Sequence, residues 1–327
     1  MQITHATAGV SAAATKPVVL ILLSHYLPGY KAGGPIRSIA NMVDALGEEL
    51  DFRIVTCDRD IGETAPFSQI EACQWVPVGK AKVLYVPDTW RALWTLLRAL
   101  IFTPADLLYL NSFFARRYSI FVLFLRWLSL FRPKSVLLAP RGEFSVGALQ
   151  IKKWRKQVYI ALARRAGLYA NVLWHASSQF EEKDIHNAFC NGESIAVAGP
   201  IAAQAGVGGR KLRIMTALDM PGEACAKRNS PKRAKAVGSI RLVFLSRISR
   251  KKNLDGAISI LRDLYGDVQF DIYGPVEDHP YWKACQDLIS QLPPNIDVRY
   301  RGDAHHDLVH HVLSQYDALL FPTHGEN

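Results

Sequence analysis

The fold class is decided by the stretch RLVFLSRISRKKNLDGAISIL, residues 241–261. It opens with an apolar run of strand length at 241–246, and an amphipathic stretch of helix length begins at residue 253. Strands that are apolar along their whole length are typical of parallel sheets that helices cover on both faces. Arg247 directly follows this strand and Lys252 stands just before the helix, at the edge where such sheets bind ligands.

The same alternation of apolar runs and helix-length stretches continues on both sides of this stretch. Toward the C-terminus the expected strands are 268–273, 298–300 and 317–321, and the expected helices are 253–265, 279–291 and 304–316. Toward the N-terminus the expected strands are 17–23, 52–57, 82–86, 106–110, 135–139, 172–175 and 194–198, and the expected helices follow Pro35 and span 89–101, 116–131 and 149–165. A chain of 327 residues also exceeds the usual size of a single core. We therefore expect an α/β protein with two doubly wound, Rossmann-like domains with parallel sheets, 17–200 and 239–327, after a flexible N-terminus at 1–16.

Positive charge accumulates between these two domains. The chain has 39 Lys and Arg against 29 Asp and Glu, and residues 201–238 alone contain 8 basic and 2 acidic residues. Because this stretch is rich in Gly, Ala, Lys and Arg, it cannot bury a core of its own, and we expect a basic linker. No aromatic residue is interleaved with its basic residues, which favours a solvated connector over a nucleic-acid site.

The sequence has neither a membrane-spanning pattern nor a secretory signal pattern. Arg98 and Arg126 break the longest apolar runs, and the five Cys show no CxxC spacing, as is usual for reduced thiols. We therefore expect a cytoplasmic protein, and the alternative left open is peripheral contact with anionic lipid at the inner face of the membrane. Trp154, Tyr159 and the basic run Lys152–Lys156 fit a contact with lipid or an acidic acceptor, but a helical core with a solvated basic face fits them better.

Glycine, polar and charged residues follow the predicted strands, where doubly wound sheets bind ligands. Two cations beside a helix start suit a diphosphate, so we favour anion binding over a solvated cluster for Arg247 and Lys252. Gly33 and Gly34 fit a plain tight turn and a close approach of phosphate to the backbone about equally well. The other candidates at this edge are Asn111, Arg141, Glu143 and Gly274.

Seven phrases, in this order along the chain, resemble the retaining nucleotide-sugar glycosyltransferases of family 4, also called group 1, which have the GT-B fold of two facing Rossmann-like domains. The phrases are SHYLPGYKAGGPIRSIANMVDAL (24–46), APRGEFSVGALQIKKWRK (139–156), LWHASSQFEEKDI (173–185), VFLSRISRKKNLDGAI (243–258), DIYGPVEDHPYW (271–282), VRYRGDAHHDLV (298–309) and LLFPTHGEN (319–327). The resemblance implies transfer of a sugar, of the hexosyltransferase type, from a nucleoside diphosphate sugar to a hydroxyl of an unidentified glycan or lipid-linked acceptor, in polysaccharide or glycolipid synthesis.

The resemblance also implies roles for single residues. The Gly33–Gly34 pair would approach the donor, and Arg247 and Lys252 would neutralise the diphosphate of the leaving nucleotide. Glu326 would be the first carboxylate of the family's Glu-x7-Glu signature, beside the donor sugar, and Gly274 would belong to the same donor site. Because two cations supply the positive charge, the resemblance implies no metal and no other cofactor.

The sequence departs from the family pattern in the first domain. Many relatives carry a His in a PHG phrase where this chain has Pro140-Arg141-Gly142-Glu143, so no acid/base His is assigned there. Arg141 either steers the acceptor or a phosphate, or pairs with Glu143, and both interpretations stay open. Together with Asn111, these two residues are the acceptor-side candidates.

A second departure is at the end of the sequence. The chain stops at Asn327, one residue after Glu326, so the second Glu of the signature is absent. We therefore expect a truncated glycosyltransferase with an incomplete second domain, reduced stability and little or no turnover.

Four histidines near the end of the chain raise the question of a metal site. The expected helix sends His306 and His310 toward solvent, and no Glu-based motif accompanies them, so an exposed helix face is favoured for His305, His306, His310 and His311. The alternative to the enzyme is a non-catalytic protein that uses the basic linker to bind nucleic acid or an anionic membrane.

Overall fold

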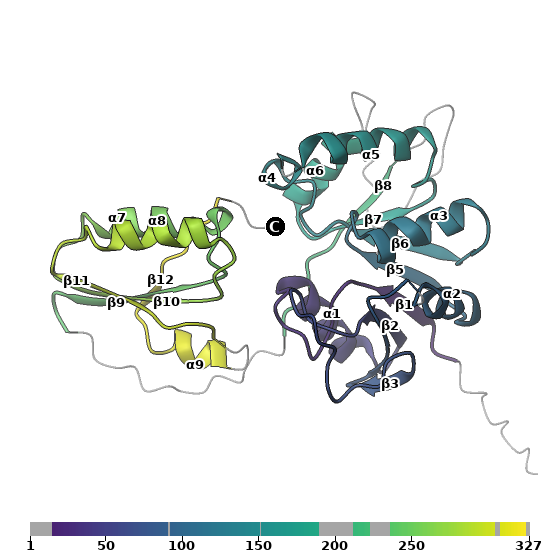
Figure 1. The fold of residues 1–327 in the computed structure, drawn as a ribbon, viewed down its shortest axis with the longest axis horizontal. Helices are drawn as coiled ribbons and strands as arrows, with labels where there is room; N and C mark the ends of the chain where they lie inside the picture. The colour runs from purple at the N-terminus through teal and green to yellow at the C-terminus, as the bar shows by residue number, and fades with distance from the viewer. Residues whose placement is uncertain are drawn as a thin grey trace, which may run out of the picture. The chain divides into compact units, whose positions relative to one another are not determined.

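The computed structural model describes residues 15–90, 92–150, 152–189, 212–222, 236–304 and 308–324. The chain divides into two α/β units, the first up to residue 223 and the second from residue 224. Each unit has its own sheet (Figure 1), and the described residues form two hydrophobic cores in the first unit and one in the second. The α/β class predicted from the sequence is therefore confirmed.

The described residues of the first unit form an eight-stranded sheet. Its strands are β1 (Val18–Leu22), β2 (Asp51–Cys57), β3 (Trp75–Val78), β4 (Ala81–Val86), β5 (Leu107–Asn111), β6 (Ser135–Ala139), β7 (Leu173–Ala176) and β8 (Arg213–Thr216). Their order across the sheet is β3-β4-β2-β1-β5-β6-β7-β8, and every neighbouring pair is parallel except β3 with β4. Because the order runs outward from β1 in both directions, the switch point, where such sheets bind ligands, lies between β1 and β5.

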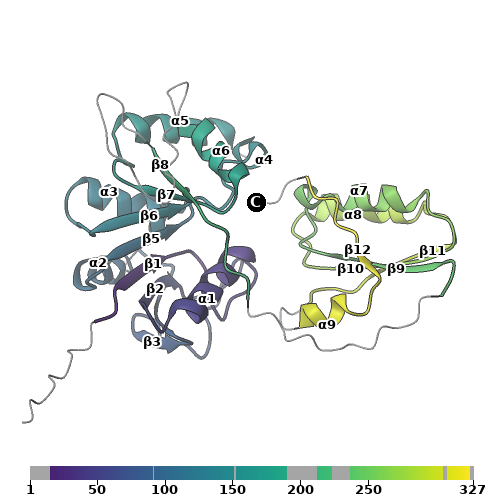
Figure 2. The same ribbon diagram turned by 180° about the vertical axis from the view of Figure 1, so that it is seen from behind.

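Helices cover both faces of this sheet (Figures 1 and 2). They are α1 (Gly34–Leu46), α2 (Ala92–Phe102), a π-helical turn (Arg116–Ile120) that leads into α3 (Phe121–Trp127), the short α4 (Val146–Gln150), α5 (Lys153–Arg165) and α6 (Gln179–Phe189). The residues of β1 alternate between two cores, as the pleat of a strand requires. Val19 and Ile21 pack in the core under α1, and Leu20 and Leu22 pack in the core under α2, α3, α5 and α6.

The second unit has a smaller parallel sheet. Its described elements are β9 (Ser239–Leu245), a 3-10 turn (Arg250–Lys252), α7 (Leu254–Leu261), β10 (Asp267–Tyr273), α8 (His279–Ile289), β11 (Ile296–Tyr300), α9 (Val309–Leu313) and β12 (Ala318–Leu319). The strand order is β11-β10-β9-β12, and all three neighbouring pairs are parallel. Helices α7 and α8 close one core on one face, and α9 lies on the opposite side of the sheet (Figures 1 and 2).

The eighth strand of the first sheet lies in a segment that the sequence suggests as linker. β8 pairs with β7 from Arg213 to Thr216, and the residues after it contact α1. Because β8 is the edge strand, one buried apolar side chain, Ile214, is enough to dock it. The structure thus differs from the prediction in that 212–222 belongs to the first unit, and the basic run 227–235 lies outside the described residues.

Most other predicted elements lie within a few residues of their expected bounds. The sequence does not predict β3, because β3 contains Pro77, a residue that is tolerated only in an edge strand. It does not predict α6 either, because α6 buries Glu181 at a position where an apolar residue would complete the apolar face of the helix. The predicted strand at 194–198 lies outside the described residues. In the part of the chain that is described, no helix is long and apolar enough to cross a membrane.

Candidate functional site

The loop after β1 brings the two adjacent glycines to the start of α1. Gly33 has φ +74°, a conformation that glycine adopts without strain, and its N–H donates to the carbonyl of Tyr30 at 3.0 Å. A Cβ atom added to Gly33 or Gly34 would meet no other atom within 4 Å. The tight turn that the sequence suggests is present, and the space beside both glycines is open to a ligand.

The carboxylate of Asp60 holds this loop in place. Asp60 is buried, and its carboxylate accepts hydrogen bonds from the backbone N–H groups of Tyr30 at 2.8 Å, Lys31 at 3.2 Å and Ile61 at 2.8 Å. The loop between β1 and α1 is therefore anchored to the residues that follow β2. Sequence reasoning did not single out Asp60, although it follows a strand at the same edge of the sheet.

Arg141, which follows β6, is fixed by residues of the neighbouring strand β5. Its Nε and Nη2 atoms donate to Oδ1 of Asn111 at 3.1 and 3.0 Å, and Nη2 also donates to the Tyr109 hydroxyl at 3.1 Å. The side chain of Arg141 is only 10% exposed. Two of the acceptor-side candidates, Asn111 and Arg141, therefore lie in direct contact next to the switch point of the sheet.

Arg141 has a further partner, Asp219, which lies in the segment after β8. Asp219 accepts a short hydrogen bond from Nη1 of Arg141 and another from the Ser38 hydroxyl, in the first turns of α1, at 2.8 Å. Burial raises the pKa of the Asp219 carboxyl, but the charge and hydrogen bond of Arg141 outweigh it, so that this pKa lies below its ordinary value. The side chain remains 38% exposed, which leaves an ionised carboxylate at the carboxyl end of the sheet.

A chain of hydrogen bonds links Arg141 to His175 in β7. The Tyr109 hydroxyl lies 2.7 Å from Nδ1 of His175, and Nε2 of His175 lies 2.9 Å from the carbonyl oxygen of Ala217. Since a carbonyl oxygen only accepts, Nε2 carries the proton and Nδ1 accepts from Tyr109. Burial is the main reason that the pKa of His175 is lowered, so the ring is neutral near pH 7.

Glu143 does not pair with Arg141, so that interpretation of the sequence is wrong. Its carboxylate accepts from the Ser112 hydroxyl at 2.7 Å and from the backbone N–H groups of Phe113 at 2.5 Å and Phe114 at 3.0 Å. Burial raises the pKa of Glu143, and these hydrogen bonds lower it in part. Glu143 thus holds the loop after β5. The backbone N–H groups of the loop after β5 donate to the Glu143 carboxylate, and the guanidinium of Arg141 is already bound to Asp219.

In the second unit, Arg247 lies two residues after the end of β9, in the loop where the sequence predicts it. Its Nη1 atom lies 2.6 Å from a carboxylate oxygen of Glu277, and the two side chains are 43% and 40% exposed. Lys252 ends the 3-10 turn, and its Nζ atom lies 5.4 Å from the centre of the Phe321 ring. Both cations therefore lie in the loop between β9 and α7, at the carboxyl edge of the sheet. Glu277, in the loop after β10, was not singled out from the sequence.

Gly274 is needed for packing at this edge. It has φ +137°, and a Cβ atom there would lie 1.9 Å from the carbonyl oxygen of Ser246, just after β9. The Tyr300 hydroxyl donates to its carbonyl at 3.0 Å. The close approach of the loops after β9 and β10 explains this glycine without a ligand, and its predicted place in the donor site stays a prediction.

Glu326 lies outside the described residues, but the residues just before it are described. The backbone N–H of His324 and the hydroxyl of Thr323 both donate to the carbonyl oxygen of Lys251 at 3.1 Å. The segment after β12 thus reaches the turn that ends with Lys252. In the described part of the chain, no group of His, Cys, Asp or Glu side chains could hold a metal ion, and His305 and His306 lie outside that part.

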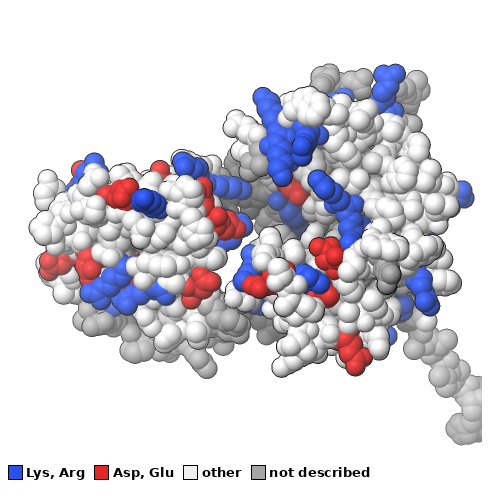
Figure 3. Space-filling model, viewed as in Figure 1, with Lys and Arg blue, Asp and Glu red and all other residues white. Residues whose placement is uncertain are grey.

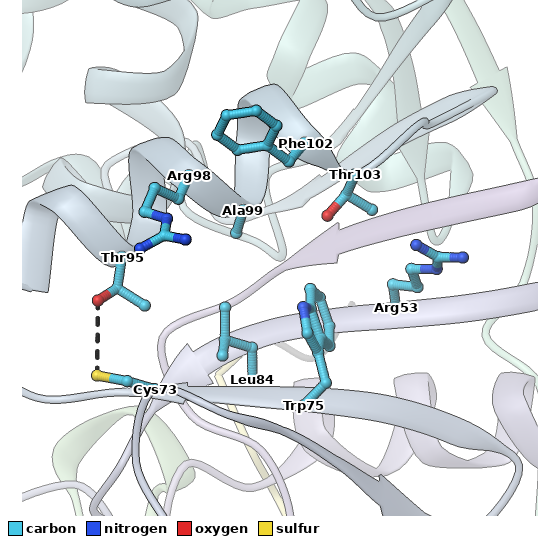
Figure 4. Close-up of a pocket in the computed structure, with 9 residues that line it drawn as sticks. All are labelled: Arg53, Cys73, Trp75, Leu84, Thr95, Arg98, Ala99, Phe102 and Thr103. Carbon is cyan, nitrogen blue, oxygen red and sulfur yellow. Dashed lines mark hydrogen bonds between the residues drawn. The ribbon is translucent and has the colours of Figure 1, made fainter.

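A separate cavity of about 420 Å³ lies between β3, β4 and α2 of the first unit (Figure 4). It is lined by Arg53, Cys73, Trp75, Leu84, Thr95, Arg98, Ala99, Phe102 and Thr103. Figure 4 shows the Cys73 thiol next to the Thr95 hydroxyl, a contact of 3.5 Å. None of the residues that follow β1, β5 or β6 lines this cavity, so it is separate from the candidate site.

No protein-family model and no curated protein matches this sequence, but solved structures match its fold. One is sucrose-phosphate synthase from Thermosynechococcus elongatus, with a TM-score of 0.61 and 11% identity over 95% of this chain and 76% of that chain. Another is Anabaena Alr3699/HepE in complex with UDP, with a TM-score of 0.56 and 12% identity over 93% of this chain and 73% of that chain. At such low identities the likeness shows the fold, which is GT-B, with two Rossmann-like units.

Proposed function

We propose that this protein is a glycosyltransferase that takes a sugar from a nucleoside diphosphate sugar and joins it to an acceptor hydroxyl with retention of the anomeric configuration. The observation that carries this proposal is the loop between β9 and α7, in which Arg247 and Lys252 stand at the carboxyl edge of a parallel sheet. A diphosphate leaving group needs positive charge there, and arginine and lysine supply it through charge-assisted hydrogen bonds. The fold is shared with a protein that has been solved in complex with UDP.

The donor subsite follows from the chemistry of a departing diphosphate. As the bond between the anomeric carbon and the phosphate oxygen breaks, negative charge develops on that oxygen, and Arg247 and Lys252 stabilise it. The acceptor oxygen forms its bond to the anomeric carbon on the same face, and its proton passes to the departing phosphate. Glu326 is proposed to accept a hydrogen bond from a hydroxyl of the donor sugar. The segment that precedes it contacts Lys251, in the same loop.

The acceptor subsite is assigned to the first unit. Arg141 is almost fully enclosed, and its guanidinium is occupied by Asn111, Tyr109 and Asp219. We therefore assign to Arg141 a positioning role and no direct contact with a ligand. We assign to the partly exposed Asp219 carboxylate the hydrogen bond from an acceptor hydroxyl, and to Arg141 the task of holding that carboxylate ionised and in place.

A turnover assay tests this function. The protein is incubated with UDP-linked and GDP-linked sugars, and release of the free nucleoside diphosphate is followed with and without sugar and glycolipid acceptors. We expect slow release with donors of one base, and NMR of the accumulated product should show the anomeric configuration of the donor. Release that depends on a donor but yields the inverted product would refute retention, and no binding or release with any nucleotide sugar would refute the function.

A further inference from the structure

The middle of the first unit has a large excess of basic over acidic residues. Residues 89–180 contain 14 Lys and Arg but only 2 acidic residues, Asp106 and Glu143. Asp106 is bound to Lys134, and Glu143 is enclosed by the loop after β5. Neither carboxylate offsets the positive charge of the helices α3 and α5, which lie in this range. Helix α5 carries five of these cations and α3 carries one, Arg126, so the excess positive charge of this surface belongs mainly to α5.

Helix α5 exposes an apolar stripe to solvent. Trp154, Val158 and Leu162 are spaced four residues apart on one face, and they are 74%, 39% and 62% exposed. The core side of the helix is formed by Ile160 and Ala163, which are buried. Trp154 is therefore not a core residue, and the interpretation of this segment as helical core with a solvated basic face is wrong for that side chain.

Basic residues flank this stripe. Lys153 and Arg155 stand beside Trp154, and Arg164 and Arg165 end the helix after Leu162. No acidic residue occurs in α5. In Figure 3, Lys and Arg side chains gather on the visible surface over α4 and α5. Helix α5 thus combines an exposed apolar stripe that begins with Trp and a rim of positive charge.

The last turn of α3 extends this surface. Trp127 donates from Nε1 to the carbonyl oxygen of Ala166, just after α5, at 3.0 Å, and Arg126 donates to the carbonyl of Ala170 at 3.0 Å. Phe124 and Trp127 stack with ring centres 6.0 Å apart, and they are 46% and 51% exposed. The exposed aromatic side chains of α3 are therefore tied to the end of α5. We call these exposed residues of α3 and α5 the α3–α5 surface.

We infer that the α3–α5 surface docks on an anionic lipid bilayer. Amphipathic helices that lie in a membrane interface combine Trp, Phe and Leu on one face with Lys and Arg beside them, and they bind anionic lipids through both. Tryptophan is favoured at the level of the headgroups because its ring is apolar and its N–H is polar. The charge complementarity of this surface selects an anionic partner. Its exposed side chains favour a bilayer, into which they can insert, over a flat polyanion.

Flotation with lipid vesicles tests this inference, which does not depend on the proposed transfer reaction. The full chain is mixed with vesicles of phosphatidylcholine alone, or of phosphatidylcholine with phosphatidylglycerol. We expect binding only to the anionic vesicles, and a loss of about 100-fold in the double variant Trp154→Ser, Leu162→Ser, because burying each of the two side chains contributes roughly tenfold in affinity. The matched control is Tyr265→Ser, which removes a side chain that is 99% exposed in the second unit and should leave binding unchanged.

A charge variant separates the electrostatic part of the binding. The triple variant Arg155→Gln, Arg164→Gln, Arg165→Gln should weaken binding by about fivefold per residue, and added salt should weaken the wild type in the same way. The control Lys283→Gln changes an exposed cation of the second unit and should have no effect. Circular dichroism melts of all variants should superimpose, since the substituted side chains are exposed.

Several outcomes would overturn the inference. They are no flotation with anionic vesicles, equal flotation with neutral vesicles, or flotation that the stripe variant leaves unchanged. Binding of a DNA oligonucleotide that the charge variant abolishes, without vesicle binding, would assign the surface to nucleic acid. A change in oligomeric state in the stripe variant, again without vesicle binding, would assign it to a second copy of the chain.

Discussion

The guanidinium of Arg141 is hydrogen-bonded to the carboxylate of Asp219, 78 positions later in the sequence. This contact joins the end of β6 to the segment after β8, and the Ser38 hydroxyl ties the same carboxylate to α1. Three separate parts of the first unit therefore meet at one carboxylate, beside the switch point of the sheet. The acceptor subsite proposed above depends on this arrangement.

Removing the charge of Asp219 should destabilise the protein. In Asp219→Asn, the enclosed guanidinium of Arg141 loses its countercharge, and we expect the free energy of unfolding to fall by about 1–3 kcal/mol. The loss should not be larger, because solvent reaches part of the Asp219 carboxylate. The control Asp297→Asn breaks a pair with Arg299 in which both side chains are 53% exposed, and should cost at most about 1 kcal/mol. Urea unfolding measures both variants. An equal cost for the two would contradict the structural role of Asp219.

The neutral ring of His175 should make stability fall in mild acid. Its pKa in the folded protein lies below the ordinary value of about 6.5, so the unfolded chain takes up a proton first as the pH falls. The contribution of His175 is therefore complete above about pH 6.5 and is lost as the pH falls from there toward the folded pKa. Thermal melts between about pH 7.5 and 5 should show a shallower decline in His175→Gln than in the wild type.

An exposed histidine provides the comparison for this pH experiment. His310 lies on the exposed side of α9, and His310→Gln checks that replacing a histidine by glutamine does not by itself change the melting temperature at about pH 7.5. A wild-type slope that also persists in His175→Gln would show that another group causes the decline.

Glu277 should compete with the donor for Arg247. The two side chains form an ion pair of 2.6 Å at the place where the diphosphate is proposed to bind. Glu277→Gln removes a negative charge near the diphosphate, and we expect UDP or GDP to bind about 3- to 10-fold more tightly in isothermal titration. The control is Asp263→Asn, an exposed acidic residue of the same unit. Weaker binding by Glu277→Gln would mean that this carboxylate contacts the nucleotide sugar itself.

Gly34→Ala separates the two interpretations of the paired glycines. Gly34 begins α1 without a positive φ, and a Cβ atom there meets nothing within 4 Å, so its substitution should leave the melting temperature nearly unchanged or slightly raised. If a substrate approaches the backbone here, the added methyl group should reduce the transfer rate by about tenfold or more. An unchanged rate would support a plain tight turn.

The fold could be predicted because the strands of both units are apolar along their length. β1 is buried on both faces, and the same is true for most of β2 and β4. β8 could not be predicted, since an edge strand with one buried residue, Ile214, has no such pattern. Its Arg213 and the charged residues around it instead give the composition of a solvated connector.

The site could be predicted only in part. The position of a residue after a strand predicts that it lies at the carboxyl edge, and this holds for Asn111, Arg141 and Arg247. It does not predict the partner of a charged side chain, because that depends on contacts between distant segments. Arg141 pairs with Asp219 and not with Glu143, which finds backbone N–H groups after β5.

Nucleotide binding tests the central claim most directly. Isothermal titration of UDP and GDP into the full chain is compared for the wild type, Arg247→Ala, Lys252→Ala and the control Lys251→Ala, an exposed cation of the same loop. A donor subsite between β9 and α7 predicts that one of the two nucleotides binds. Each of Arg247→Ala and Lys252→Ala should weaken it roughly 10- to 100-fold, and Lys251→Ala by less than about threefold. Equal affinity in all four proteins, or no binding of either nucleotide by the wild type, would contradict the account.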